Sequence, residues 1–166
     1  MNIQYSEIRE SDFEFVKGIY DYYILNTTST YFTDKISIDE LKRFIPLNHE
    51  KYKSYLIKVD DAFCGFCYLA QYNKRQAYDR TAEVSLYIHP EFTGKGIGAF
   101  VLNHLEEIAL QKNISILIGI ISGDNDRSIK LFERCGYEKC AHYKQIGEKF
   151  NKLLDVVAYQ KMIKRK

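Results

Sequence analysis

The clearest hydrophobic pattern in the chain is a strict alternation over residues 81–88. One set of alternate positions is Thr81, Glu83, Ser85 and Tyr87, and the other is Ala82, Val84, Leu86 and Ile88. Side chains of a β-strand point alternately to its two faces. The segment is therefore predicted to be a half-buried strand that presents a glutamate on its more polar face.

The rest of the chain follows either the strand or the helix pattern. Apolar runs predict strands over 3–8, 54–59, 63–71, 115–121, 137–146 and 153–162. Helices are predicted after two capping boxes (Ser11-x-x-Glu14 and Ser37-x-x-Glu40, the latter running through Ile45), from Ile97, and after an Asn125 cap. No repeat or proline-rich linker interrupts this order. We expect residues 1–166 to form a single domain, a mixed α/β sheet with helices packed on it.

Composition excludes several classes of function. The chain has 166 residues, 46% of them hydrophobic and 28% charged, which suits one soluble domain that needs no disulfides. A net charge of +2 argues against a dedicated nucleic-acid-binding protein. The N-terminus lacks the apolar core of a signal peptide, and no run approaches the length of a membrane span. We therefore expect a cytoplasmic protein with no nucleic-acid or membrane partner.

The four cysteines are predicted to be reduced residues without a metal. Cys64 and Cys67 have the CxxC spacing of zinc and redox sites, but they fall within an expected strand. Residues three apart on a strand point to opposite faces, so the two thiols are expected to diverge. No His or Cys pair completes a metal-ligand set. Cys135 lies at a predicted helix C-terminus, where the helix dipole disfavours a thiolate, which argues against a covalent acyl-enzyme.

A glycine-rich turn follows the alternating strand. Its sequence is Thr93-Gly94-Lys95-Gly96-Ile97-Gly98, immediately before an amphipathic helix. Glycines allow backbone amides to approach an anion, and a helix N-terminus favours negative charge, so the turn suits a pyrophosphate. It lacks the Gly-Lys-Ser/Thr ending of a Walker loop and the spacing of a Rossmann fingerprint. Taken alone, a simple strand-to-helix turn explains it equally well.

This turn resembles the Gln/Arg-x-x-Gly-x-Gly/Ala motif of the GNAT acetyltransferases. The resemblance extends to the phosphinothricin and methionine-sulfoximine acetyltransferase subgroup through five ordered stretches: 19–32, Arg75-Gln76-Ala77-Tyr78, 81–88, Asn125-x-x-Ser128-Ile129 and 147–155. It implies a mostly antiparallel sheet flanked by about four helices, acetyl-CoA as co-substrate without a metal, and a homodimer.

The resemblance also assigns site residues. Glu83 is the implied general base, and the backbone of Leu86, Tyr87 and Ile88 is implied to bind the pantetheine arm. The turn from Gly94 to Gly98, including Lys95, Gly96 and Ile97, would hold the pyrophosphate, with Asn125 and Ser128 nearby. The implied acceptor-binding residues are Arg75, Tyr78, Thr28, Tyr31 and Lys149. The alternatives are a solvent-facing or salt-bridged Glu83, a helix cap at Asn125 and ordinary surface residues elsewhere.

Two departures from the family pattern affect the chemistry. Thr93 replaces the usual Gln or Arg before the glycines, which removes one expected phosphate contact. Phe132 occupies the position four residues before Gly136-Tyr137 where the family has Tyr or His. Phenylalanine has no proton to give, so the donor to the leaving thiolate is undefined.

Three functions remain open at this point. The first is an N-acetyltransferase that acts by direct attack on the amine of a small amino-acid-like compound, of the phosphinothricin, methionine sulfoximine or methionine sulfone type. The second is the same enzyme with a peptide N-terminus, polyamine or aminoglycoside as acceptor. The third is a non-catalytic acyl-CoA-binding regulatory module, which Phe132 motivates.

Overall fold

The computed structural model describes residues 1–164, which form one continuous sheet of seven strands with four α-helices. The strands are β1 (Ile3–Glu7), β2 (Ser54–Val59), β3 (Ala62–Gln71), β4 (Thr81–Ile88), β5 (Ile116–Ser122), β6 (Glu138–Lys149) and β7 (Lys152–Met162). The helices are α1 (Phe13–Asn26), α2 (Ile38–Leu41), α3 (Ile97–Gln111) and α4 (Asp126–Arg134). Short 3-10 turns lie at Glu10–Asp12, Gln76–Tyr78 and Pro90–Phe92.

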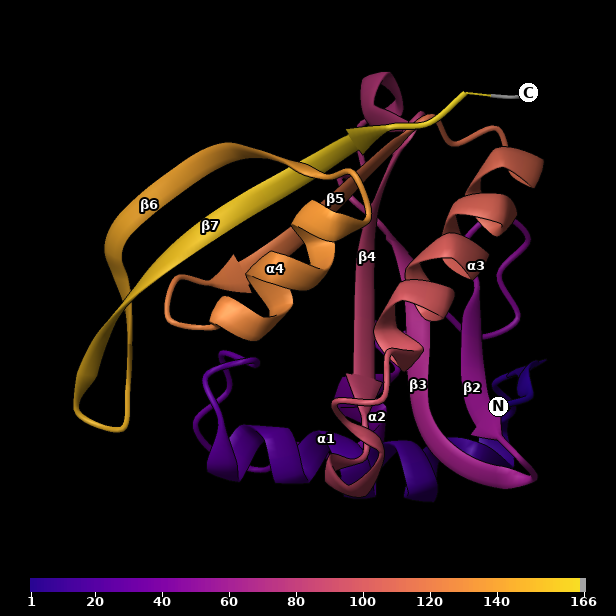
Figure 1. Cartoon of the computed structure of the whole chain (residues 1–166), viewed down its shortest axis with the longest axis horizontal. Helices are drawn as coiled ribbons and strands as arrows, with labels where there is room; N and C mark the ends of the chain where they lie inside the picture. The colour runs from indigo at the N-terminus through magenta and orange to yellow at the C-terminus, as the bar shows by residue number, and fades with distance from the viewer. Residues whose placement is uncertain (165–166) are drawn as a thin grey trace.

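The sheet has the strand order β1-β2-β3-β4-β5-β7-β6. Only the β4–β5 pair is parallel, and every other neighbouring pair is antiparallel. Figure 1 shows α3 and α4 on one face of the sheet, while α1 crosses near the lower end of the central strands. The expectation of a mixed, mostly antiparallel sheet flanked by about four helices is confirmed.

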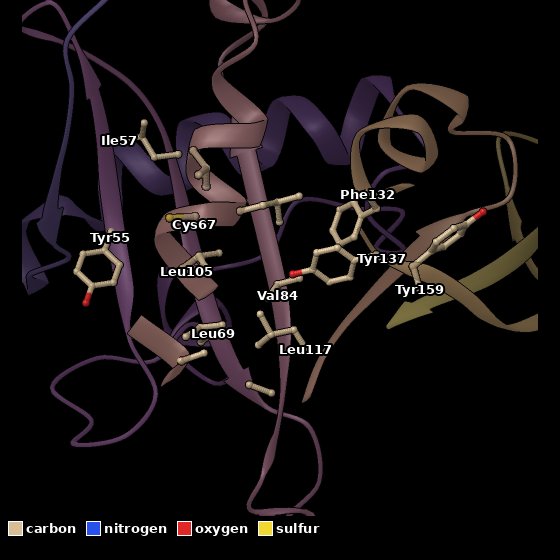
Figure 2. Close-up of a cluster of buried hydrophobic side chains, with 14 of the residues drawn as sticks. Tyr55, Ile57, Cys67, Leu69, Val84, Leu105, Leu117, Phe132, Tyr137 and Tyr159 are labelled. Carbon is tan, nitrogen blue, oxygen red and sulfur yellow. The ribbon is translucent and has the colours of Figure 1, made fainter. Parts of the chain in front are cut away.

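Two hydrophobic cores lie on opposite faces of the sheet, and β4 contributes to both. Ala82 and Val84 are buried in the core under α3 and α4, with Leu86 and Ile88 packed against it. Tyr87 packs on the core under α1 and α2. The predicted alternation of β4 is confirmed. Figure 2 shows part of the larger core, in which Cys67, Leu69, Val84, Leu105 and Leu117 come together.

Two of the three predicted helix starts that rest on a cap are confirmed. The Ser37 hydroxyl accepts from the Glu40 amide at 3.2 Å, and a Glu40 carboxylate oxygen accepts from the Ser37 amide at 2.7 Å. Asn125 Oδ1 accepts from the Ser128 amide at 3.1 Å. The helix after Ser37 is shorter than expected, since it ends at Leu41 rather than reaching Ile45.

The predicted capping box at Ser11 is wrong. Residues Glu10–Asp12 form a 3-10 turn, and α1 begins only at Phe13. Asp12 provides the cap of that turn, because its carboxylate accepts from the Arg9 amide at 2.8 Å. The start of α1 itself has no side-chain cap hydrogen bond.

The expected divergence of Cys64 and Cys67 is also wrong. Ile57 pairs with Gly65 and Lys58 with Phe63, so Cys64 is an extra residue in a β-bulge. A bulge shifts the alternation of the strand by one position. Both thiols therefore lie in the core under α3. All four cysteines are free, and the described residues contain no cluster of three or more metal-ligating side chains.

None of the helices within residues 1–164 combines the length and the apolar character needed to cross a membrane.

Candidate active site

The sheet opens where β4 and β5 separate. Their parallel pairing covers only Thr81–Ile116, Ala82–Leu117 and Glu83–Ile118. Beyond Glu83 the two strands part, and Figure 1 shows β5 slanting away from β4 behind α4. Two cavities lie along this opening, one on each side of the sheet. They share Ser29, Ser85, Tyr87 and Ile120, so they meet at the gap between the strands.

The first cavity, which we call the turn cavity, has a volume of about 590 Å³. It is lined by the second half of β4, the glycine-rich turn, the end of β5 and one face of α4. The structure brings together here nine of the ten predicted cofactor residues: Leu86, Tyr87, Ile88, Gly94, Gly96, Ile97, Gly98, Asn125 and Ser128. The exception is Lys95, whose ammonium lies over the Phe92 ring, 5.0 Å from its centroid.

The geometry of the turn requires glycine at two positions. Gly94 has φ 81° and Gly96 has φ 80°, values that favour glycine over any residue with a side chain. Gly96 is the N-cap of α3, so the first free amides of a 15-residue helix point into the turn. Such a helix end favours an anion. Thr93 stays within the turn, since its hydroxyl donates to the Pro90 carbonyl at 2.7 Å.

The second cavity, which we call the tyrosine cavity, has a volume of about 930 Å³ and contains Glu83 and Tyr31. Glu83 is half-buried and is the one carboxylate among the described residues that line it. Burial raises the pKa of Glu83 above its ordinary value. Burial also raises the pKa of Tyr31 to about 12, with a further contribution from the nearby charge of Glu83. A carboxylate with a raised pKa inside a cleft is suited to accept a proton near neutral pH.

Comparison with known proteins identifies this arrangement. The model of the acetyltransferase (GNAT) family matches residues 16–137. The chain belongs to the GNAT acetyltransferase family. It is therefore an acetyltransferase that uses acetyl-CoA, and the turn cavity suits that co-substrate because it combines a β-strand edge with an anion-binding helix end.

Individual relatives support the same subgroup. Phosphinothricin N-acetyltransferase of Streptomyces coelicolor is 24% identical over 157 residues, which cover 92% of this chain and 91% of the relative. The L-methionine sulfoximine/L-methionine sulfone acetyltransferase of Pseudomonas aeruginosa is 24% identical, with 90% and 88% covered. The crystal structure of a phosphinothricin acetyltransferase from Sinorhizobium meliloti in complex with acetyl-CoA has a TM-score of 0.90 at 26% identity, covering 98% of this chain and 89% of that one.

Arg127 is a basic residue beside the glycine-rich turn that the sequence analysis missed. It lines the turn cavity, and a Cβ atom placed on Gly94 would lie 3.3 Å from its Nη2 atom. The guanidinium therefore stands over the turn where Thr93 offers no cation. Lys130 and Arg134 line the same cavity one and two turns further along α4. The helical spacing of these three basic residues, directly after the Asn125 cap, could have predicted a basic face of α4 beside the turn.

We expect Arg127→Gln to raise the KM for acetyl-CoA roughly 3- to 10-fold with little change in kcat. An exposed charged hydrogen bond contributes modestly and is screened by salt, so the effect should shrink as ionic strength rises. Initial-rate kinetics at two salt concentrations measure it. Arg9→Gln, at a surface arginine outside both cavities, is the control. An unchanged KM at low salt would remove Arg127 from the binding site.

The loop after α1 forms part of the boundary between the cavities and is tied down at three points. The Thr28 hydroxyl donates to Asp124 at 2.7 Å, Asn125 Nδ2 donates to the Ser29 hydroxyl at 3.1 Å, and Lys149 Nζ donates to the Thr30 carbonyl at 2.9 Å. Thr28 and Lys149 were predicted to bind the acceptor, but neither lines a cavity. Both side chains tie the loop down, and their role at the acceptor stays a prediction.

Asp124 accepts the hydrogen bond from Thr28 and two further hydrogen bonds, from Ser122 and Lys152. Burial opposes its charge, but hydrogen bonds from Ser122, Lys152 and Thr28 outweigh that effect and lower its pKa to about 2. Asp124 is consequently ionised throughout the neutral range. It connects the loop to the end of β5 and to the start of β7.

Arg75 and Tyr78 lie outside the tyrosine cavity in this chain. Both are exposed, and the Tyr78 ring packs edge-on against Tyr72 with centroids 5.7 Å apart. The preceding residues Tyr72, Asn73 and Lys74 do line the cavity. The loop before β4 therefore lies at the cavity as predicted, but its lining residues are Tyr72, Asn73 and Lys74 rather than Arg75 and Tyr78.

Phe132 provides no acid group at its position. Its buried ring packs against Tyr137, with centroids 4.8 Å apart, and fills the space above Gly119. The Tyr137 hydroxyl is buried without a hydrogen-bond partner among the described residues, and burial raises its pKa. In the turn cavity, the Tyr23 hydroxyl already donates to the Ile88 carbonyl at 2.6 Å. Phe132 thus serves the core and one cavity wall.

Proposed function

We propose that this protein, acting as one catalytic domain over residues 1–166, acetylates the primary amine of an amino-acid-like compound of the phosphinothricin, methionine sulfoximine or methionine sulfone type. The single observation that carries the proposal is the meeting of the two cavities at Ser85 and Tyr87, with Glu83 on the acceptor side. An amine bound beside Glu83 faces the gap through which the other cavity opens. The relatives named for these substrates support the acceptor class.

The residues favour direct transfer in a ternary complex. An amine is mostly protonated at neutral pH and must lose its proton before it attacks. Glu83 is placed to accept that proton, directly or through water. No cysteine is found among the described residues that line either cavity, which agrees with a route without an acyl-enzyme. When bound, acetyl-CoA supplies the activated thioester.

The charge of the tyrosine cavity disfavours a polycationic acceptor. Lys42, Arg43 and Lys74 line it together with one carboxylate, Glu83. Lys42 is paired with Glu10, but a polyamine or aminoglycoside would still meet the cations of Arg43 and Lys74, unpaired among the described residues, whereas an acceptor that carries a carboxylate or phosphinate would be attracted. This is the specific observation that ranks an amino-acid-like acceptor above the alternatives.

We also propose a cytoplasmic homodimer. The four free cysteines agree with a reducing compartment. Exposed apolar side chains gather on the β6–β7 hairpin, with Tyr143, Ile146, Phe150 and Leu153 each more than half exposed. Such a patch is the kind of surface that a second copy covers. Sedimentation velocity would contradict the dimer if it gave a monomer at micromolar concentration.

The test of the function is a panel of amines with thiol release as readout. We expect turnover with at least one amino-acid-like compound and none above background with spermidine, an aminoglycoside or a peptide N-terminus. Turnover only with a polycation would favour the second candidate acceptor class. A thermal shift with acetyl-CoA but no turnover with any amine would establish a binding module instead.

A further inference from the structure

The tyrosine cavity is walled mainly by aromatic rings. Eight of its lining side chains are aromatic: Tyr20, Tyr31, Phe32, Phe44, Tyr52, Tyr68, Tyr72 and Tyr87. Its volume of about 930 Å³ is near the upper end for a small-molecule site. A methionine sulfone side chain would leave most of this apolar wall uncovered. The walls therefore point to an acceptor with a larger apolar body.

The rings around Tyr20 pack against one another. Tyr20 is buried, and its ring centroid lies 5.6 Å from that of Phe44, 5.2 Å from that of Tyr87 and 6.3 Å from that of Phe32. Phe32 and Phe44 stack with centroids 6.0 Å apart. Tilted and edge-on pairs at these separations are favourable, so the rings form a preorganised wall.

The outer rings remain open to solvent. Tyr31 is 45% exposed, Phe32 is 40% exposed and Tyr72 is 42% exposed, while the deeper rings Tyr20, Tyr52 and Tyr68 are buried. The apolar surface at the mouth is thus available to a ligand, whereas the surface at the base is not. A flat aromatic group entering beside Phe32 would remove this exposed surface from water.

The charged residues of the tyrosine cavity indicate which polar groups the acceptor carries besides its apolar body. Glu83 lines the tyrosine cavity at the last β4–β5 pair, two residues before Ser85, which both cavities share, and an amine beside it lies near the opening to the turn cavity. Lys42 is already paired with Glu10, but Arg43 and Lys74 are exposed and form no ion pair with any described residue. Two free cations suit a carboxylate on the acceptor. An aromatic amine without an acid group would leave them unused.

We propose that, among amino-acid-like acceptors, an α-amino acid with an aromatic side chain is preferred over the smaller methionine sulfone type; this rests on the proposed N-acetyltransferase function. The ring packs against Phe32 and Phe44, and the carboxylate faces Arg43 and Lys74. The ammonium gives its proton to Glu83, and the amine nitrogen bonds to the acetyl carbon. The carbon–sulfur bond breaks with its electron pair on sulfur, the nitrogen loses its second proton, and the thiolate takes up one proton through water, which leaves the neutral amide and the free thiol.

The experiment compares kcat/KM for L-phenylalanine, L-methionine sulfone and phenethylamine at saturating acetyl-CoA. The first two are α-amino acids of similar length that differ in the polarity of the side chain, and the third lacks the carboxylate. We expect L-phenylalanine to exceed each of the others at least about 10-fold. A preference for methionine sulfone or for phenethylamine overturns the proposal while leaving N-acetyltransfer intact. If neither these three compounds nor any amine of the wider panel described under the proposed function is turned over, the proposed N-acetyltransferase function itself is overturned.

Two matched variants test the aromatic wall. Phe32→Ala should lower kcat/KM for L-phenylalanine roughly 3- to 10-fold, the worth of one aromatic contact, and change that for methionine sulfone less than about twofold. Phe63→Ala is the control, because Phe63 is a comparably exposed phenylalanine, 49% exposed, outside both cavities. Since Phe32 is partly exposed, its variant should fold, which a melting curve checks. An equal loss with both substrates overturns the assignment of the wall.

Discussion

Glu83→Gln is expected to lower kcat/KM for the acceptor amine by about 10²–10⁴, the usual contribution of a positioned general base. Glutamine keeps the size of the side chain and its place at the end of the β4–β5 pairing, but it cannot accept a proton. The KM for acetyl-CoA should stay close to that of the wild type, because Glu83 lies in the tyrosine cavity and not in the turn cavity.

The pH dependence supplies a second signature of Glu83. Burial raises its pKa above that of an ordinary glutamate, and the carboxylate can act as a base only when it is ionised. Wild-type kcat/KM should therefore fall as pH decreases through this raised pKa. The limb that Glu83 causes should be absent in Glu83→Gln, leaving only the ionisation of the amine itself.

The control is Glu14→Gln, an exposed glutamate on α1 outside both cavities. It should leave kcat/KM unchanged. If Glu83→Gln retains wild-type kcat/KM between about pH 6 and 9 with a turned-over acceptor, the assignment of the base is wrong and water or another group takes the proton.

Gly65→Ala is expected to lower the free energy of unfolding by about 1–3 kcal/mol, the usual cost of overpacking a core. A Cβ atom on Gly65 would lie 2.4 Å from the Tyr87 carbonyl oxygen and 3.1 Å from the Ile88 Cα. Both contacts are with backbone, so no side chain can rotate away and β3 must move from β4. The same movement displaces the half of β4 that lines the turn cavity, so activity should fall too.

Gly18→Ala provides the matched comparison. Gly18 lies within α1, and a Cβ atom there would meet no atom within 4 Å. Alanine is the better helix former, so this variant should gain roughly 0.5–1 kcal/mol. Chemical denaturation measures both variants. A Gly65→Ala protein as stable as the wild type would mean that the strands have room that the structure does not show.

Local patterns predicted the fold well because the β4 alternation and the caps at Ser37 and Asn125 depend on near neighbours in the sequence. The failures arose where a longer-range or competing contact decided the outcome. Before α1, a 3-10 turn over Glu10–Asp12 occupies the predicted first turn, and the Asp12 carboxylate accepts from the Arg9 amide instead of a Ser11 hydroxyl capping the helix. At Cys64 a bulge, which depends on the register with β2, reversed the face of the thiol.

The site shows the same division. The glycine turn and the β4 face could be predicted because each is one continuous stretch of sequence. Arg127 was missed because its guanidinium reaches Gly94 only through the packing of α4 beside the turn. The hydrogen bonds of Thr28 to Asp124 and of Lys149 to Thr30 could not be predicted, because each joins residues about a hundred positions apart. The aromatic wall combines residues from α1, the following loop, β3 and β4, so no single stretch of sequence could predict it.

The early separation of β4 from β5 has a consequence for the lifetime of the protein. Past Glu83, β4 has no β5 partner on that side, so the sheet contains an internal edge beside the turn cavity. A ligand that binds only the folded state stabilises it by RT ln(1 + [L]/Kd), about 2.7 kcal/mol at a hundredfold excess over Kd. Acetyl-CoA bound to the folded chain should therefore slow its loss by unfolding, and the melting temperature should rise with the concentration of acetyl-CoA.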